Sequence, residues 1–328
     1  MKISSAFRLG MCVGAVLCVG FARGWAAPHK VGVVMKDRSA YWRGFARSAV
    51  EAAKELKVEA IAKEPLHLSS PHQVQALQAI AEAGVQALVI SPVGSVAQSG
   101  DARYDAALLD ALKKLRERGV QIVTLNNALP DQLAATCIRT DRNAMTQAGV
   151  EAFIASVGER GEAAVFRIAA MDVVVGDRDL AVLKAMKKER PNASLHTDVM
   201  FSGTGAEGLV QAERLLAKYP ACQTIFAAGY DAMLAMIRVI EKKQLGEKHH
   251  VIGFGTTATI TPEIAAAIRS GALGALVCVD ATAIGRKGME SAVALLDGKT
   301  VPAVIEVSHV VVTRANLATI KIQDAETP

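Results

Sequence analysis

Apolar and polar stretches alternate along most of the chain with a period of roughly 30 residues. Runs without polar alternation, such as 31–35 and 87–90, are separated by amphipathic stretches long enough for helices. Strands that are buried on both faces and joined by helices are typical of parallel sheets. Gly84 and Gly119 follow two of the amphipathic stretches, where glycine favours the left-handed turn that ends a helix. The pattern therefore predicts an α/β protein.

One interruption of this rhythm divides the chain into two halves. The segment 135–140 is strand-like and follows strand 121–125 without a helix between them, which indicates a crossing between two domains. Two doubly wound halves, each with its own sheet, are the simplest architecture. The predicted strands are 31–35, 58–62, 87–90, 121–125, 135–140, 163–168, 195–200, 224–228, 250–254 and 273–279, with an extended tail at 304–313. The predicted helices are 42–56, 71–83, 104–118, 143–156, 178–189, 206–218, 231–243, 262–269 and 282–296.

The first residues differ from the rest of the chain. Lys2 and Arg8 precede an apolar run at 11–21, and small residues follow, with Gly24 and Ala26 at the positions that a signal peptidase reads. This pattern predicts a secretory signal peptide over residues 1–26, cleaved after Ala26. The run is shorter than the ~20 residues of a membrane-spanning helix, so we expect an exported protein that is free in the periplasm, without membrane insertion.

Charge and cysteine content narrow the function further. Removal of the leader leaves 34 basic and 32 acidic residues, so electrostatics give no reason to expect nucleic-acid or anionic-membrane binding. Cys137, Cys222 and Cys278 remain in the exported part, and their spacing matches no metal motif. Because all three lie in or beside apolar runs, we expect buried free thiols.

Motifs for catalysis are missing. The sequence has no Gly-x-Ser-x-Gly elbow and no His-Glu-x-x-His helix, and the glycine-rich segment 203–208 lacks the lysine of a phosphate-binding loop. His249 and His250 precede a strand and are expected to be loop residues rather than metal ligands. We therefore predict a protein that is not an enzyme and that needs no cofactor or metal.

Several segments together resemble the type I periplasmic binding proteins of the ribose-binding subgroup. These are 31–45, 84–92, 119–126, 140–149, 225–228, 251–254 and 275–285, together with the segment around Arg178. The resemblance implies two doubly wound parallel-sheet lobes joined by three crossover strands, which close on a small ligand. It places lobe 1 at 27–139 plus 280–308 and lobe 2 at 140–279 plus 309–328. It also implies a monomer.

The resemblance also implies a set of ligand-binding positions. Tyr41 and Trp42 correspond to aromatics that sandwich a sugar ring, although aromatics at a helix start can also simply pack against the sheet. Arg178 corresponds to an arginine that bonds ligand oxygens from the start of a helix. Asp280 is either a ligand contact or a hydrogen-bonding group of the hinge. The full set is Asp37, Tyr41, Trp42, Ser91, Asn126, Thr140, Arg178, Gly229, Gly255 and Asp280.

Four positions depart from the sugar-binding pattern. Asn126 and Gly255 stand where the family has Asp, Gly229 where it has Asn, and Val279 where it has Gln. Each sugar hydroxyl left unpaired would cost roughly 1–3 kcal/mol, against ~8 kcal/mol for micromolar binding. The sequence thus disfavours a plain monosaccharide. It favours a sugar derivative, a sugar acid that pairs with Arg178, or a larger, less polar compound for which the two glycines make room.

Two functions fit these observations. The protein captures a small molecule for an ABC permease, or it presents the bound ligand to a periplasmic sensor domain of a histidine kinase or chemoreceptor. Neighbouring permease and ATPase genes would favour transport, and a kinase gene would favour sensing. The same family comparison puts Cys137 and Cys278 on neighbouring crossover strands, where a disulfide is conceivable.

Overall fold

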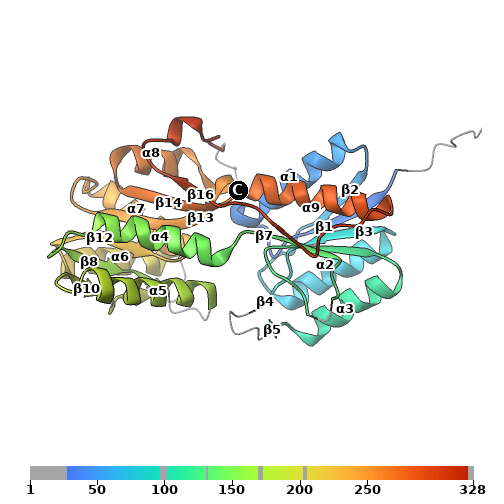
Figure 1. Cartoon of the computed structure of the whole chain (residues 1–328), viewed down its shortest axis with the longest axis horizontal. Coiled ribbons are helices and arrows are strands. Elements are labelled where there is room, and N and C mark those ends of the chain that lie inside the picture. Colours follow the sequence, from blue (N-terminus) through green and yellow to red (C-terminus); the bar gives the residue numbers. More distant parts are fainter. Residues whose placement is uncertain (1–27, 97–101, 131, 169–172, 202–204, 324–328) are drawn as a thin grey trace, which may run out of the picture.

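Two lobes lie side by side along the long axis of the molecule (Figure 1). The structure is a computed structural model, and it describes residues 28–96, 102–130, 132–168, 173–201 and 205–323. The signal peptide predicted over residues 1–26, with its cleavage after Ala26, lies outside the described residues. Within them, no helix is both long and apolar enough to pass through a lipid bilayer.

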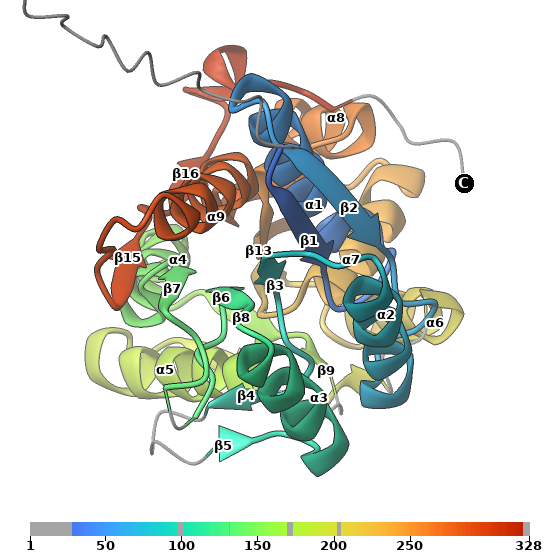
Figure 2. The same cartoon turned by 90° about the vertical axis from the view of Figure 1, so that its right-hand side faces the viewer.

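The first lobe is built on a six-stranded parallel sheet with the order β15-β7-β6-β3-β1-β2. Helices α1 and α9 pack on one face and helices α2 and α3 on the other, as the end-on view in Figure 2 shows. The strands are β1 (Lys30–Val34), β2 (Glu59–Lys63), β3 (Ala87–Ile90), β6 (Gln121–Leu125), β7 (Thr136–Arg139) and β15 (Val304–Glu306). The helices are α1 (Ala40–Glu55), α2 (Ser70–Glu82), α3 (Ala106–Glu117) and α9 (Ala281–Leu296).

The second lobe repeats this plan with the strand order β10-β8-β12-β13-β14-β16, in which only the edge strand β16 is antiparallel. The strands are β8 (Glu162–Val165), β10 (Ser194–His196), β12 (Cys222–Ala227), β13 (His250–Thr256), β14 (Leu273–Val279) and β16 (Val310–Val312). The helices are α4 (Arg142–Ser156), α5 (Val173–Glu189), α6 (Gly205–Lys218), α7 (Tyr230–Lys242) and α8 (Pro262–Ser270).

Short elements complete the two lobes. They are the antiparallel pair β4 (Ser95–Val96) and β5 (Ala102–Arg103), the parallel pair β9 (Arg167–Ile168) and β11 (Met200–Phe201), and the 3-10 turns η1 (Thr257–Thr259) and η2 (Leu317–Thr319).

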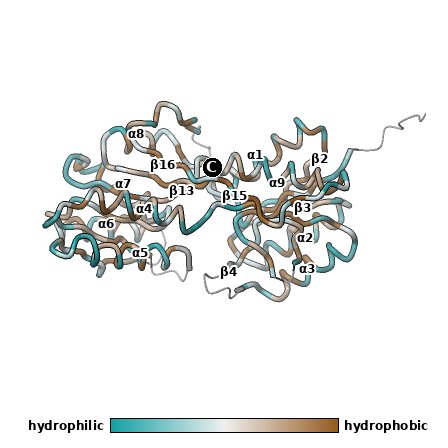
Figure 3. The backbone as a smooth tube through the Cα atoms, viewed as in Figure 1, coloured by the Kyte–Doolittle hydropathy of each residue, from teal (hydrophilic) through white to brown (hydrophobic). Residues whose placement is uncertain are grey.

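Figure 3 shows that hydrophobic stretches run through the strands inside each lobe, whereas hydrophilic stretches follow the outer loops and helix faces. The cores are therefore formed by the strands that the apolar runs predicted.

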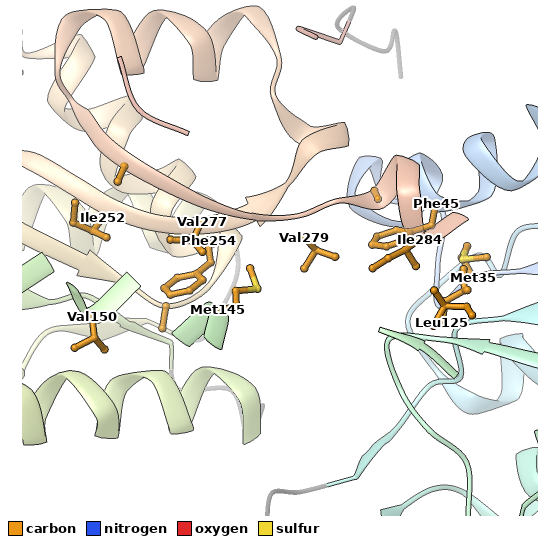
Figure 4. Close-up of a cluster of buried hydrophobic side chains, with 14 of the residues drawn as sticks. Met35, Phe45, Leu125, Met145, Val150, Ile252, Phe254, Val277, Val279 and Ile284 are labelled. Atoms are coloured by element: carbon orange, nitrogen blue, oxygen red, sulfur yellow. The ribbon is translucent and has the colours of Figure 1, made fainter. Parts of the chain in front are cut away.

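The chain passes between the two sheets three times. These passages join β7 to α4, β14 to α9 and β15 to β16. Val279 lies on the second of them, between the apolar side chains of the two lobes, with Phe254 on one side and Ile284 on the other (Figure 4). The predicted fold, two doubly wound lobes joined by three crossovers, is confirmed.

Several predicted boundaries are wrong in ways that affect the site. Helix α5 begins at Val173, so Arg178 lies in its second turn and not at its start. Strand β13 continues to Thr256, so Gly255 lies inside the strand and not after it. The predicted strands 163–168 and 195–200 are each divided into two shorter strands, and the predicted extended tail 304–313 contains the two strands β15 and β16. Apolar runs show where the chain is buried, but they do not show where hydrogen bonding to a neighbouring strand stops.

Candidate functional site

A cleft of about 450 Å³ lies between the two lobes. The first lobe contributes the loop after β1, the first turn of α1 and the residues after β6. The second lobe contributes residues from α4, α5, α7 and β13. In parallel α/β sheets, ligands bind where loops converge at the carboxyl ends of the strands, and this cleft lies at that edge of both sheets.

Tyr41 and Trp42 form an aromatic wall on the first lobe. The centroids of their rings are 4.9 Å apart, and the ring of Trp42 lies 5.4 Å from that of the buried Phe45. Both residues line the cleft while they also pack against the core of the lobe. The two interpretations of the sequence are therefore compatible. Lys36 adds a cation on this wall, with its ammonium 5.1 Å from the centroid of the Trp42 ring.

Arg178 and Phe254 form the opposite wall, on the second lobe. The guanidinium carbon lies 3.9 Å from the centroid of the Phe254 ring, which is a cation–π arrangement. Arg178 Nη1 also donates a 2.7 Å hydrogen bond to the Ala228 carbonyl, and Nη2 lies 3.7 Å from the sulfur of Met145. Phe254 and Met145 lie close together in Figure 4. The orientation of Arg178 is thus set by a residue of β13 and not by the start of a helix.

A group of polar residues lies where β6 and β7 end. Asn126 adopts a left-handed φ of 65°, and its carbonyl accepts a 3.2 Å hydrogen bond from Arg142 Nη2. The same nitrogen donates to Asn127 Oδ1, while Asn127 Nδ2 donates to the Gly94 carbonyl at 2.7 Å. Arg142 begins α4, so these bonds connect the second lobe to the first beside the crossover that carries Thr140.

Two carboxylates line the cleft from opposite lobes. Asp37 lies in the loop after β1, and its Oδ1 accepts a 2.8 Å hydrogen bond from the backbone N–H of Ser39. Asp231 lies in the first turn of α7. Desolvation, together with the nearby negative charge of Asp37, raises the pKa of Asp231. Its negative charge is therefore held in an unfavourable environment.

The two glycines do not enlarge the cleft, contrary to the sequence prediction. A Cβ on Gly229 would lie 2.6 Å from Ile168 Cδ1, and one on Gly255 would lie 3.1 Å from Thr259 Oγ1. Both glycines line the cleft, but the space beside each is filled by the protein itself. Their smallness allows close packing inside the second lobe.

Ser91 and Asp280 do not line the cleft, and their proposed ligand contacts are therefore corrected. Ser91 is fully buried at the end of β3, where its carbonyl accepts a 2.9 Å hydrogen bond from Gln73 Nε2. Asp280 caps α9, because its Oδ1 accepts a 3.0 Å hydrogen bond from the Ala283 N–H. The hydroxyl of Thr257 also donates to that oxygen, at 3.4 Å. Of the two roles that the sequence left open for Asp280, the structure therefore supports the second, a hydrogen-bonding group at a crossover between the lobes.

The sequence matches a model of the periplasmic binding protein domain over residues 31–300. The chain belongs to this family. A search of curated proteins gives no match.

Solved structures of similar fold include ABC-transporter solute-binding proteins. One from Burkholderia graminis, in complex with D-arabinose, has a TM-score of 0.75 and 19% identity, with 90% of this chain and 98% of that chain covered. One from Agrobacterium vitis, bound with α-D-tagatopyranose, has a TM-score of 0.73 and 17% identity over 91% and 100%. Another from Agrobacterium vitis, with bound D-fucose, has a TM-score of 0.72 and 23% identity over 88% and 96%. At these identities the similarity establishes the fold.

This periplasmic binding protein has cleft residues that the sequence reasoning missed. Each follows directly on a strand end or opens a helix beside one, so a wider window around each predicted strand end would have found most of them. Phe254 is the exception, because an apolar residue inside a strand gives no sign that it supports an arginine. The missed residues with polar or aromatic groups are Ser39, Asn127, Arg142, Tyr230, Asp231 and Phe254.

The three described cysteines of this binding protein are buried and free. Burial raises the pKa of each thiol, which makes all three poorly reactive. Cys137 lies on β7 and Cys278 on β14, in different sheets. The prediction of buried thiols is confirmed, and the suggested disulfide between Cys137 and Cys278 is wrong.

Proposed function

We propose that this protein captures a small solute from the periplasm in the cleft between its lobes and delivers it to an ABC permease. The observation that supports this most directly is the pairing of two unlike walls across one cleft. Tyr41 and Trp42 stand on the first lobe, and Arg178, supported by Phe254, stands on the second. An open protein offers a solute one wall at a time, whereas a closed one offers both, so the ligand selects the closed form.

The two lobes are proposed to move about the three crossovers. This assigns 27–139 plus 280–308 to one moving unit and 140–279 plus 309–328 to the other. Each passage between the sheets is only a few residues long, which suits a hinge whose backbone rotations are confined to a short segment. We further propose that the leader is removed after Ala26 and that the mature chain acts as a monomer.

The proposed ligand is a sugar or a sugar-like polyol, and simple monosaccharides are included. Asn126, Gly229, Gly255 and Val279 lack the hydroxyl partners that the family has at these positions. Other hydrogen-bonding side chains also line the cleft, those of Asn127, Arg142, Tyr230 and Asp231. Proteins of the same fold were solved with D-arabinose, D-fucose and allitol bound. Plain monosaccharides are therefore among the proposed ligands.

The test is a thermal-shift screen of residues 27–328 against pentoses, hexoses, polyols and sugar acids, followed by calorimetry on the hits. A ligand at 100 times its Kd adds ~2.7 kcal/mol to the free energy of unfolding. Trp42→Ala and Arg178→Ala should each weaken binding at least tenfold, while Glu55→Ala, on the outer end of α1, should not. Absence of any hit across the screen, or chemical turnover of a hit, would refute the proposal.

A further inference from the structure

Three loops of the first lobe are bonded to one another beside the first crossover. Asn127 follows β6 and is only 5% exposed, and its Nδ2 donates to the carbonyls of Pro92, at 3.5 Å, and Gly94, at 2.7 Å. The Gly94 carbonyl also accepts a 3.4 Å hydrogen bond from Lys36 Nζ. Because these residues follow β1, β3 and β6, the bonds join three strand ends into one unit.

Arg142 binds to this unit from the second lobe. Its Nη2 donates to the Asn126 carbonyl at 3.2 Å and to Asn127 Oδ1. Arg142 is the first residue of α4, and the start of this helix is fixed because the side chain of Asp141 accepts hydrogen bonds from two N–H groups of the first turn. Hydrogen bonds from a charged donor are stronger than neutral ones, so these two bonds form a tie between the lobes.

The backbone of Asn126 is held in an uncommon conformation at the same place. Its φ of 65° is left-handed, and residues other than glycine keep such a conformation where the surrounding contacts hold them in it. The N–H of Asn126 donates to the Ile138 carbonyl of β7 at 2.8 Å, and its carbonyl accepts from Arg142. One crossover strand and one helix of the other lobe thus hold the two backbone groups of this residue.

The tie lies on the cleft side of the hinge. Arg142, Asn126 and Asn127 all line the cleft, as does Thr140 of the first crossover. When two lobes swing apart about a hinge, groups on the cleft side move away from each other. Opening therefore stretches the bonds of Arg142, whereas closure preserves them, so the tie limits how far the lobes separate.

We propose that Arg142 is a positioning residue that keeps the two lobes near their binding arrangement by tying α4 to the strand ends of the first lobe. This inference rests on the proposed solute-binding function and adds how the closed form is favoured. The apparent affinity of a ligand falls in proportion to the fraction of molecules in the competent arrangement. Loss of the tie therefore weakens the binding of every ligand by the same factor.

The test uses residues 27–328 and begins without ligand. Arg142→Gln keeps a polar side chain but removes the charge and the fork of donors. Small-angle scattering of the ligand-free variant should give a larger radius of gyration than that of the wild type, because the lobes open further. Calorimetry should then show about tenfold weaker binding, equal for D-galactose, D-fucose and every other hit of the screen. D-Fucose lacks one hydroxyl of D-galactose, so this pair detects a direct contact with the ligand.

A second variant disturbs the tie from outside the cleft. Gly94 lies outside the residues that line the cleft, and a Cβ at this position would be 2.5 Å from the Arg103 carbonyl oxygen. Gly94→Ala therefore displaces the carbonyl that holds Asn127. It should also increase the radius of gyration of the ligand-free protein and weaken the binding of all ligands equally.

Arg190→Gln is the matched control. Arg190 also donates to backbone carbonyls, those of Val157 at 2.9 Å and Ile154 at 3.1 Å, but both partners belong to its own lobe. The variant should lower the melting temperature while the radius of gyration and the affinities stay unchanged. It thus separates the loss of an arginine that supports the fold from the loss of one that ties the lobes.

The possible failures are distinguishable. An unchanged radius of gyration in ligand-free Arg142→Gln would overturn the inference and leave solute binding intact. An affinity loss that differs between ligands in Arg142→Gln, with normal binding in Gly94→Ala, would overturn it as well, because Arg142 would then act on the ligand itself. If no compound of the screen binds to the wild type, the proposed function fails, and the scattering of the ligand-free variants still decides whether Arg142 ties the lobes.

Discussion

Gly149 tests whether the Phe254 ring positions Arg178. It lies on α4, outside the residues that line the cleft, and a Cβ at this position would be 2.3 Å from Phe254 Cζ. Ordinary carbon contacts are about 3.5–4.0 Å, so Gly149→Ala forces the ring to move by roughly 1 Å. Phe254 is 2% exposed, and its ring faces the guanidinium of Arg178 at 3.9 Å. The displacement is therefore passed to the wall of the cleft.

The expected size of both effects follows from these contacts. Overpacking a core by one methyl group typically costs about 1–3 kcal/mol of unfolding free energy. A disturbed cation–π contact is worth about 0.5–2 kcal/mol, so ligand affinity should fall roughly 2- to 30-fold. Urea denaturation measures the first effect, and calorimetry with the ligand found in the screen measures the second.

The control is Gly176→Ala on α5, where an added Cβ meets nothing within 4 Å. It should raise the stability slightly, because alanine has the higher helix propensity. If Gly149→Ala lowers stability but leaves affinity unchanged, Phe254 does not position Arg178. If it changes neither, the ring has room to move and the packing argument is wrong.

Three further predictions concern stability and the cores. In Gly44→Ala the new Cβ would lie 2.0 Å from that of Ala258 in η1, across the contact between α1 and the second lobe. The variant should therefore lower the unfolding free energy by about 1–3 kcal/mol and increase the radius of gyration in small-angle scattering. An unchanged radius would contradict this. Burial raises the pKa of Asp179 to about 6 against the opposing effect of Arg167, so the folded state binds more protons than the unfolded one between roughly pH 4 and 6. Stability should therefore fall as pH rises through this window, by roughly 2–3 kcal/mol at most, and Asp179→Asn should abolish the slope; an equal slope in the variant would assign it to another group. The buried thiols of Cys137, Cys222 and Cys278 should not react with Ellman's reagent in the native mature protein. In denaturant all three should react, with or without prior reduction. A thiol count that rises after reduction would reveal a disulfide.

Arg178 lines the cleft as predicted, but its orientation has a different cause from the one that the sequence suggested. Its assignment to a helix start suggested that a helix terminus directs it into the cleft. In the structure α5 begins earlier, and the direction comes from Phe254 and the Ala228 carbonyl, which are 76 and 50 positions away along the chain. Contacts over such separations leave no local pattern, because they depend on how β12 and β13 pack beside α5.

Much of the architecture could be read from the sequence. Strands Ala87–Ile90, Gln121–Leu125 and Leu273–Val279 have the predicted bounds, because continuous apolar runs must be buried on both faces of a sheet. The crossover after β7 was visible as a strand that follows another strand without a helix between them. The resemblance to periplasmic binding proteins placed Tyr41, Trp42 and Asn126 at the ligand site, and all three line the cleft.

Only the tertiary structure decided the chemistry of the cleft. Ser91 has a polar side chain and directly follows a strand, as a ligand contact would, but the side chain of Gln73 and the end of β1 enclose it. Gly229 and Gly255 suggested empty space that Ile168 and Thr259 fill. The sequence determines which residues reach a strand end, since burial follows from local apolar pattern. Which of them face the ligand depends on the packing of side chains from distant segments, and that packing exists only in the folded chain.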